Sequence, residues 1–274
     1  MIPKKIKVKA QNFFRKIRLL KAIEYLQYLF RSWSLRKSNS RFIDLNPTFS
    51  LPPAYLAYDA YSAPDWNFYK TSGEGTADFL ITIINKYLTS NEEIAVYEWG
   101  CGPGRVIRSL QAKLPASAKV YGSDYNPETI EWCTKNLQKI NFSLNQLSPP
   151  LPYKNAQFDV AYCISVFTHL SELNGLSWAD ELHRVLKPGG LLVITTAGDY
   201  SFETDLLANE KEEYKDRGIV TRGEYEEGKK MYLARHNPTY VKNILLKKFE
   251  HLEHVTAGFP FIFQDFWLVR KPNV

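Results

Sequence analysis

The chain has 274 residues, 45% of them hydrophobic, and a formal charge of +6 at pH 7. That length suits one globular α/β domain with additions and is long enough to bury a sizeable core. The three cysteines, Cys101, Cys133 and Cys163, have neither metal-binding nor disulfide spacing, which excludes a disulfide scaffold and suits a reducing compartment.

Residues 1–41 form a basic arm. They hold 12 lysines and arginines against one acid, Glu24, so the arm carries +11 and the remaining chain −5. Apolar residues recur there at helical spacing, which predicts an amphipathic helix with a stripe at Leu19, Ile23, Leu26 and Phe30.

Charged residues interrupt the apolar residues of this arm, which excludes both a signal peptide and a membrane span. A basic helix with aromatic residues can contact an anionic membrane, a partner protein, the catalytic body or a nucleic acid. The acidic balance of the remaining chain argues against nucleic acid. We therefore expect a cytoplasmic protein, with peripheral contact at the inner membrane face as one alternative.

Residues 42–92 form a lead-in. Four prolines predict irregular structure over residues 42–66, and the apolar spacing of Phe79, Ile83 and Tyr87 predicts a helix from Gly75 to Leu88.

The segment 96–106, VYEWGCGPGRV, reads as a short apolar strand that ends near Glu98 and turns through Gly100, Gly102 and Gly104 into a helix. Arg105 occupies the position of the third glycine in the dinucleotide fingerprint, which disfavours a nicotinamide cofactor. The Glu98 carboxylate would repel a pyrophosphate and attract a ligand with an ammonium and a sulfonium. S-adenosylmethionine is such a ligand.

A second predicted strand ends at Asp124, 26 residues after Glu98. An acid at about this distance from a glycine turn is the expected partner of ribose hydroxyls. The two acids and the glycines together indicate a ligand site and disfavour a purely structural turn.

Strands and helices alternate from residue 93 onward, which predicts a mostly parallel sheet with helices on both faces. A charged segment at 199–237 interrupts the alternation after the fifth strand, and it is either a cover for the substrate or a solvated helix and loop. The predicted strands are 93–98, 119–124, 139–144, 158–164, 190–196, 249–255 and 263–270, and the predicted helices are 127–139, 176–186 and 238–248.

Four successive motifs resemble those of class I S-adenosylmethionine-dependent methyltransferases: EWGCGPGRV, GSDYNP, PPLPYKNAQFDVAYCISVFTHL and WADELHRVLKPGGLLVITT. The resemblance covers residues 50–274. Within the family, the chain resembles in particular a subgroup associated with bacterial glycans and polysaccharides. It implies a Rossmann-like seven-stranded sheet whose last strand is antiparallel. It divides the chain into the arm 1–41, a lead-in and cofactor cap 42–92, and a methyltransferase domain 93–274 with the insertion 199–237 on the substrate side.

The resemblance implies O-methylation of a sugar or another small hydroxyl acceptor, with S-adenosyl-L-methionine as cofactor and no need for a metal. Two alternatives stay open: an RNA or protein methyltransferase that uses the basic arm, and a non-catalytic regulatory module with the same fold. The first lacks the N-P-P-Y signature of base-amine methylation, because the residues after the fourth strand read CISVFTHL.

The resemblance also assigns roles to single residues. The glycines of the turn cradle the cofactor, and Arg105 either binds its carboxylate or pairs with acids on its own helix. Tyr69 and Lys70 become candidates for a lid. The other implied contacts are Glu98 at the amino acid end, Asp124 on the ribose, Tyr125 on the adenine, Asn145 at the adenine amino edge, and Ser165 and Val166 beside the methyl group.

His169 is the first candidate for a general base, because imidazole titrates near neutrality and this residue follows the fourth strand. His236 and Asp265 are weaker candidates. Related sequences often carry a histidine where this chain has Ala197, so the protein either uses another base or methylates an acceptor that needs none.

Overall fold

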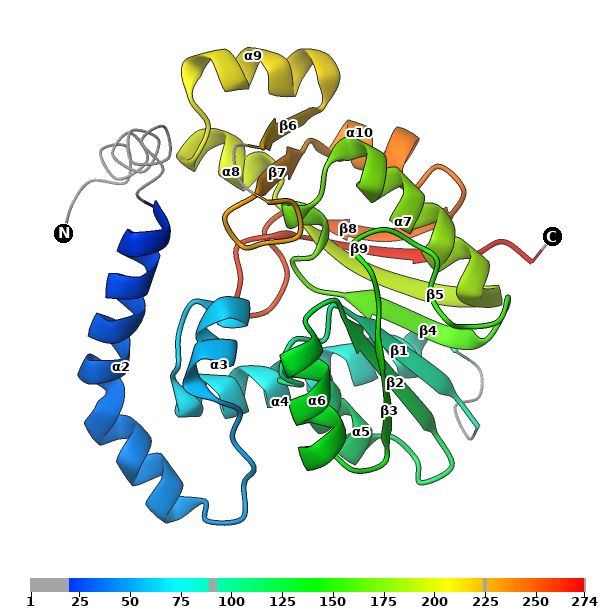
Figure 1. The fold of residues 1–274 in the computed structure, drawn as a ribbon. Coiled ribbons are helices and arrows are strands. Elements are labelled where there is room, and N and C mark those ends of the chain that lie inside the picture. Colours follow the sequence, from blue (N-terminus) through cyan, green and yellow to red (C-terminus); the bar gives the residue numbers. More distant parts are fainter. Residues whose placement is uncertain (1–19, 89–92, 224–225, 274) are drawn as a thin grey trace.

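The computed structural model describes residues 20–88, 93–223 and 226–273. A seven-stranded sheet in the order β3-β2-β1-β4-β5-β9-β8 forms its centre (Figure 1). The strands from β3 to β5 pair in parallel, and β9 runs antiparallel to both β5 and β8, which confirms the predicted fold. The strands are β1 (Ala95–Trp99), β2 (Lys119–Asp124), β3 (Ile140–Leu144), β4 (Phe158–Cys163), β5 (Leu186–Thr196), β8 (Glu250–Val255) and β9 (Asp265–Arg270).

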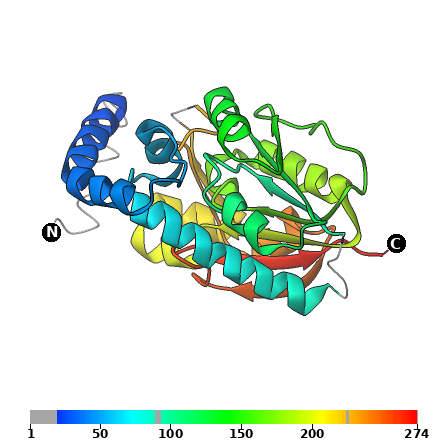
Figure 2. The ribbon, with the colours of Figure 1, turned by 90° about the horizontal axis from the view of Figure 1, so that it is seen from below.

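Two apolar layers sandwich the sheet. Because side chains alternate along a strand, Val96 of β1 packs toward α4 (Trp66–Tyr87) and α5 (Ile107–Lys113), and Tyr97 packs on the opposite face. That second face is covered by α7 (Glu172–Val185) and by α10 (Pro238–Tyr240) with the π-helical turn Val241–Leu245. Figure 2 shows α4 running along the underside of the sheet.

The lead-in is more helical than the sequence predicted. Helix α3 (Ala54–Tyr61) lies inside the stretch that was expected to be irregular. Helix α4 begins at Trp66, nine residues before the predicted start at Gly75, because the Asp65 side chain caps it by accepting a hydrogen bond from the Phe68 amide. By contrast, the predicted helix 238–248 is shorter in the structure, because α10 covers Pro238–Tyr240 and passes into the π-helical turn.

The described part of the basic arm is one long helix, α2 (Leu20–Leu45), which crosses the expected boundary at residue 41. It stands beside α3, away from the central sheet (Figures 1 and 2). Phe42 is buried against the lead-in, and Asn39 donates a hydrogen bond to the Pro64 carbonyl. Leu19, the first residue of the predicted stripe, lies outside the described residues.

The insertion after β5 folds into helices α8 (Asp199–Thr204) and α9 (Ala208–Arg217) and a hairpin of β6 (Ile219–Arg222) with β7 (Leu233–His236). Arg222 of β6 connects the strand to α9 and to the end of α8, because its guanidinium donates hydrogen bonds to both carboxylate oxygens of Glu210 and to the Asp205 carbonyl. Among the described residues, no helix is long and apolar enough to span a membrane.

Candidate active site

A cavity of about 470 Å³ lies at the carboxyl ends of β1, β2, β3 and β4. This volume falls within the roughly 300–1,000 Å³ of small-molecule sites. Among the predicted cofactor-binding and catalytic residues, Gly104 does not line the cavity, and a Cβ added to it would meet Leu137 and Cys133. The predicted residues that line the cavity are Glu98, Gly100, Gly102, Arg105, Asp124, Tyr125, Asn145, Ser165, Val166 and His169.

The glycine turn after β1 has a backbone that other residues rarely adopt. Gly100 and Gly102 have φ angles of +70° and +50°. A Cβ atom on Gly100 would also lie 2.5 Å from Cγ2 of Val166. The Gly102 amide donates a 2.9 Å hydrogen bond to Oδ2 of Asp124, so the turn is fixed to the end of β2.

Asp124 and Asn145 end two neighbouring strands. Asp124 is 9% exposed, and its other carboxylate oxygen accepts a 2.9 Å hydrogen bond from the Asn126 amide. Burial nevertheless raises the pKa of Asp124 above its ordinary value. Asn145 donates through Nδ2 to the Gln146 carbonyl, and its buried Oδ1 has no hydrogen-bond partner among the residues that the structure describes. This oxygen can accept a hydrogen bond from a ligand amino group.

Glu98 and Arg105 place a carboxyl group and a guanidinium at the end of β1. Glu98 is 3% exposed and accepts a 2.9 Å hydrogen bond from the Tyr162 hydroxyl. Burial raises the pKa of Glu98 to about 8, against an ordinary value of 4.5.

Arg105 is a buried cation that forms no ion pair within the described ranges. Its guanidinium donates to the Ser72 hydroxyl at 2.8 Å and lies 4.7 Å from the centre of the Tyr61 ring, and its Nε is buried without a partner. Helix α5, which follows it, contains no acid, so the predicted alternative of pairing on its own helix is wrong.

His169 lies at the cavity wall in the turn Phe167–His169, after β4. Its Nδ1 is 2.7 Å from the Tyr232 carbonyl, so Nδ1 carries the proton and Nε2 keeps a lone pair. Burial lowers the pKa of His169 below 6.5, which keeps the ring neutral at pH 7.

The two weaker candidates for a base lie outside the cavity. Burial lowers the pKa of His236 to about 3. Asp265 is fully buried and accepts a 2.9 Å hydrogen bond from Nε2 of His254. Neither side chain is placed to take a proton from a molecule in the cavity.

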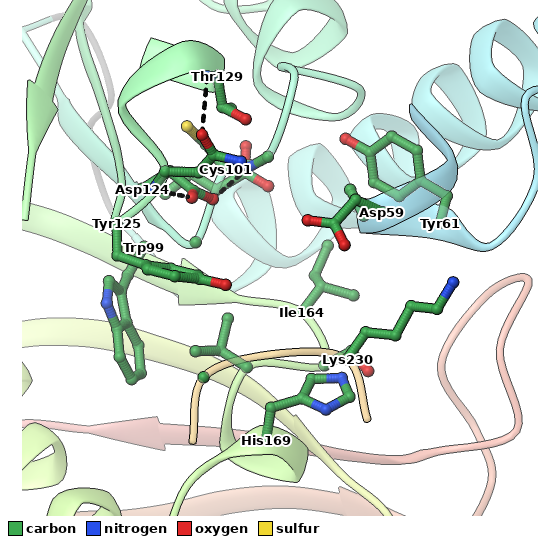
Figure 3. A pocket seen from close by; sticks show the side chains of 18 of the residues that line it. Asp59, Tyr61, Trp99, Cys101, Asp124, Tyr125, Thr129, Ile164, His169 and Lys230 are labelled. Carbon is green, nitrogen blue, oxygen red and sulfur yellow. Dashed lines mark hydrogen bonds between the residues drawn. The ribbon is translucent and has the colours of Figure 1, made fainter. Parts of the chain in front are cut away.

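The lid residues predicted from the sequence do not line the cavity. The Tyr69 hydroxyl donates a 2.6 Å hydrogen bond to the Pro103 carbonyl, and Lys70 pairs with Glu74 at 3.5 Å. The wall on that side comes instead from α3, where Asp59 and Tyr61 face the cavity (Figure 3).

The loop between β6 and β7 closes another side of the cavity. The Lys230 ammonium pairs with Glu24 of α2 at 2.6 Å and lies 3.8 Å from the centre of the Tyr58 ring. Lys229 lies 4.8 Å from the centre of the Tyr125 ring, and the Gly228 amide donates to the His169 carbonyl at 2.8 Å. The insertion therefore lines the cavity at Gly228 and Lys230, and Lys230 connects it to the N-terminal helix.

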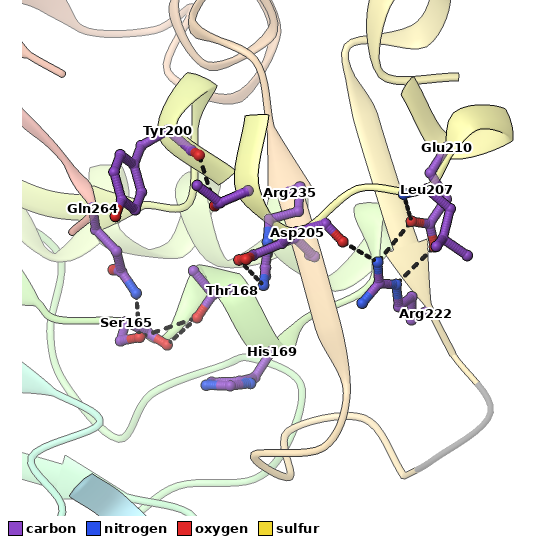
Figure 4. A network of polar contacts seen from close by, with 12 residues as sticks. Ser165, Thr168, His169, Tyr200, Asp205, Leu207, Glu210, Arg222, Arg235 and Gln264 are labelled. Atoms are coloured by element: carbon purple, nitrogen blue, oxygen red, sulfur yellow. Dashed lines mark hydrogen bonds and ion pairs between the residues drawn. The ribbon is translucent and has the colours of Figure 1, made fainter. Parts of the chain in front are cut away.

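A polar network fixes Ser165 at the end of β4 (Figure 4). Ser165 has a φ angle of +63°, which a residue other than glycine adopts only when its surroundings hold it there. The Ser165 amide donates to Thr195 at 2.8 Å, and Nε2 of Gln264 donates to the Ser165 hydroxyl at 2.7 Å. Gln264 comes from the segment before β9, and no local sequence motif identifies it as a site residue.

The strand order places these groups in a row. Asn145 follows β3, Asp124 ends β2, Glu98 with Arg105 lies at β1, and Ser165 follows β4. The unpartnered oxygen of Asn145 matches the adenine amine of S-adenosylmethionine, and the carboxyl group of Asp124 matches its ribose hydroxyls. Arg105, beside Glu98 and the glycine turn, matches the zwitterionic amino acid end. The residues present therefore fit this cofactor. The described residues contain no group of three potential ligands that could hold a metal ion.

Comparisons with known proteins match the segment of the chain that contributes the strand ends of this site. Residues 97–194 match the family model of a methyltransferase domain. A tRNA (carboxymethyluridine(34)-5-O)-methyltransferase from Arabidopsis thaliana is 33% identical over 113 residues, which are 41% of this chain and 26% of that protein. A ubiquinone/menaquinone biosynthesis C-methyltransferase from a Geobacter strain is 30% identical over 105 residues, 36% of this chain and 43% of that protein.

The match to these curated relatives thus spans less than half of their length. A crystal structure of a methyltransferase from Methanosarcina mazei that depends on S-adenosylmethionine aligns with a TM-score of 0.51 and 23% identity, over 69% of this chain and 97% of that one. That likeness shows the fold. The family model therefore assigns residues 97–194 to a methyltransferase domain.

Proposed function

We propose that the protein transfers a methyl group from S-adenosylmethionine to a hydroxyl of a small polar acceptor, with a sugar as the favoured class. The observation that carries this proposal is a neutral His169 with a free Nε2 at the wall of a cavity that also holds Glu98 and Asp124. A deprotonated imidazole nitrogen suits an acceptor whose hydroxyl proton must be removed.

The chain's own residues would hold the cofactor in the order of the strands. The Asn145 oxygen would accept from the adenine amine, and Asp124 would accept from the ribose hydroxyls. Arg105 would bind the carboxylate of the amino acid end and Glu98 its ammonium. Gly100 and Gly102 leave room for this end because neither has a side chain.

When bound, the cofactor supplies an electrophilic methyl group on a sulfonium, which suits in-line displacement by an acceptor oxygen. His169 would take the hydroxyl proton on Nε2 while the Tyr232 carbonyl holds Nδ1–H in place. Ser165, held by Gln264, would orient a polar group of the acceptor next to Val166. Alignment of this kind can supply much of the rate without a metal.

The side of the cavity opposite the strand ends supports a hydroxylated acceptor. It combines two charged side chains, Asp59 and Lys230, with the half-exposed aromatic ring of Phe261. A sugar offers hydroxyls to charged groups and an apolar ring face to an aromatic side chain.

Titration calorimetry of S-adenosylmethionine and S-adenosylhomocysteine tests the cofactor part. Binding should weaken in Asp124→Asn and stay unchanged in Asp180→Asn, a matched change on α7 in which an exposed carboxylate pairs with Lys248. Failure of the folded wild type to bind either compound would refute the proposal and favour a non-catalytic module.

Transfer of a radiolabelled methyl group to separate pools of sugars, nucleotide-linked sugars, RNA and protein tests the acceptor. Label in a sugar pool supports the proposal. Label confined to RNA or protein would overturn the choice of acceptor while leaving the cofactor part intact.

A further inference from the structure

Helix α2 contacts the protein through a narrow stripe of mixed polar and apolar side chains, and it leaves several large apolar side chains exposed. The inward positions recur every three or four residues, at Tyr28, Ser32, Leu35, Asn39 and Phe42. Glu24 also faces inward, where it pairs with Lys230 and accepts a hydrogen bond from Tyr58.

The outward side of α2 carries five large apolar side chains within nine residues. Their exposed fractions are between 44% and 66%, which is unusual for neighbouring positions of one helix. We call this surface the outer face, and it consists of Tyr25, Leu26, Leu29, Phe30 and Trp33.

From this arrangement we infer that the outer face of α2 docks on an anionic lipid surface. Arg36 and Lys37 follow the outer face on the same helix, and Arg36 lies 4.5 Å from the centre of the Trp33 ring. Glu24 is the one acid between residues 22 and 43, and its charge is turned inward and paired. The whole segment 1–41 carries +11, so charge complementarity favours a negatively charged partner.

The chemistry of the outer face favours lipid over the other anionic or apolar partners. Leu26, Leu29 and Phe30 would insert between acyl chains, and Trp33 with a flanking arginine suits the headgroup level. A phosphate backbone would use the basic residues and leave the leucines exposed. Symmetric pairing with a second copy would bring two segments of +11 together.

Co-sedimentation of the full chain with vesicles tests the inference without any turnover. The protein should sediment with mixed phosphatidylcholine–phosphatidylglycerol vesicles and not with pure phosphatidylcholine. The triple variant Leu26→Ser, Phe30→Ser, Trp33→Ser should bind more weakly by roughly tenfold or more. The matched triple Leu173→Ser, Ile244→Ser, Val255→Ser, which alters exposed apolar residues elsewhere, should bind like the wild type.

Tryptophan fluorescence gives a second readout that does not depend on the folding of a triple variant. Brominated lipids should quench Trp33, and Trp33→Phe should remove that quenching. Trp33 is 61% exposed, whereas the other tryptophans are buried or half-buried: Trp66, Trp99, Trp132, Trp178 and Trp267.

Three results would overturn the inference. They are vesicle binding that survives in the folded triple variant, binding to transfer RNA without binding to vesicles, and self-association through α2 with no response to lipid.

Discussion

Replacing Glu98 with glutamine should stabilise the protein when no cofactor is bound. Burial raises the pKa of this carboxyl to about 8 in the folded protein, against 4.5 for the exposed group. At pH 7 the unfolded chain therefore carries an ionised Glu98, and folding must return a proton to it. Glutamine has nearly the same shape and needs no proton.

The size of the effect follows from the two pKa values. At pH 7 the free energy of folding includes a cost of about 3 kcal/mol for protonating Glu98, since each pKa unit is worth about 1.4 kcal/mol. The folded state binds more protons than the unfolded state between pH 4.5 and about 8, so wild-type stability falls as pH rises through this window. The advantage of Glu98→Gln should grow from below about 1 kcal/mol at pH 5 to about 3 kcal/mol at pH 7.

Urea unfolding of both proteins at several pH values measures this difference. Glu181→Gln is the matched control. Burial is the largest single effect on the pKa of Glu181 and raises it, but hydrogen bonds from Arg184 and from the Leu151 amide, together with the Arg184 charge, lower the pKa overall. This variant should therefore lose stability. An advantage of Glu98→Gln that does not change between pH 5 and 8 would refute the reasoning.

The Glu98→Gln variant should also bind S-adenosylmethionine more weakly than the wild type, because the partner of the cofactor's ammonium is lost.

Two further outcomes are expected. If His169 accepts the hydroxyl proton, the acid limb of kcat/KM should lie below pH 6.5, because burial lowers the pKa of His169. His169→Gln should then lower kcat by about 10²–10⁴-fold with cofactor binding unchanged, and an unaltered pH profile would contradict the role. Cys101, Cys133 and Cys163 are all buried, so Ellman's reagent should react slowly with the native protein. After unfolding it should react with three thiols. Rapid labelling of the native protein would show that at least one thiol becomes exposed without unfolding.

The cofactor half of the site could be predicted from the sequence because short stretches of chain determine it. Strand β1 and its glycine turn follow from local backbone preferences, and the spacing from Glu98 to Asp124 is one strand–helix–strand unit. Residues from distant segments could not be predicted, since Asp59, Lys230 and Gln264 reach the site only through tertiary packing.

The predicted start of α4 was wrong for a physical reason. Glycine disfavours helix interiors, so Gly73 and Gly75 in the sequence argue for a later start. In the structure both lie inside the helix, because other segments pack closely against it. A Cβ on Gly73 would lie 2.2 Å from the Arg105 carbonyl oxygen, and one on Gly75 would lie 2.6 Å from the Phe261 ring. These glycines therefore let α4 approach the cofactor turn and the loop before β9.

The cavity is lined by residues from two parts of the chain, one inside the segment that matches the methyltransferase family model and one outside it. The segment 97–194 that matches the methyltransferase family contains Glu98, Arg105 and Asp124, whereas Asp59, Lys230 and Phe261 lie outside it. Under the proposed function, substitutions of Asp59, Lys230 or Phe261 would change which acceptor the cavity admits and would leave the cofactor contacts of Glu98, Arg105 and Asp124 in place. Divergence of acceptor preference among relatives should therefore be sought before residue 97 and after residue 194.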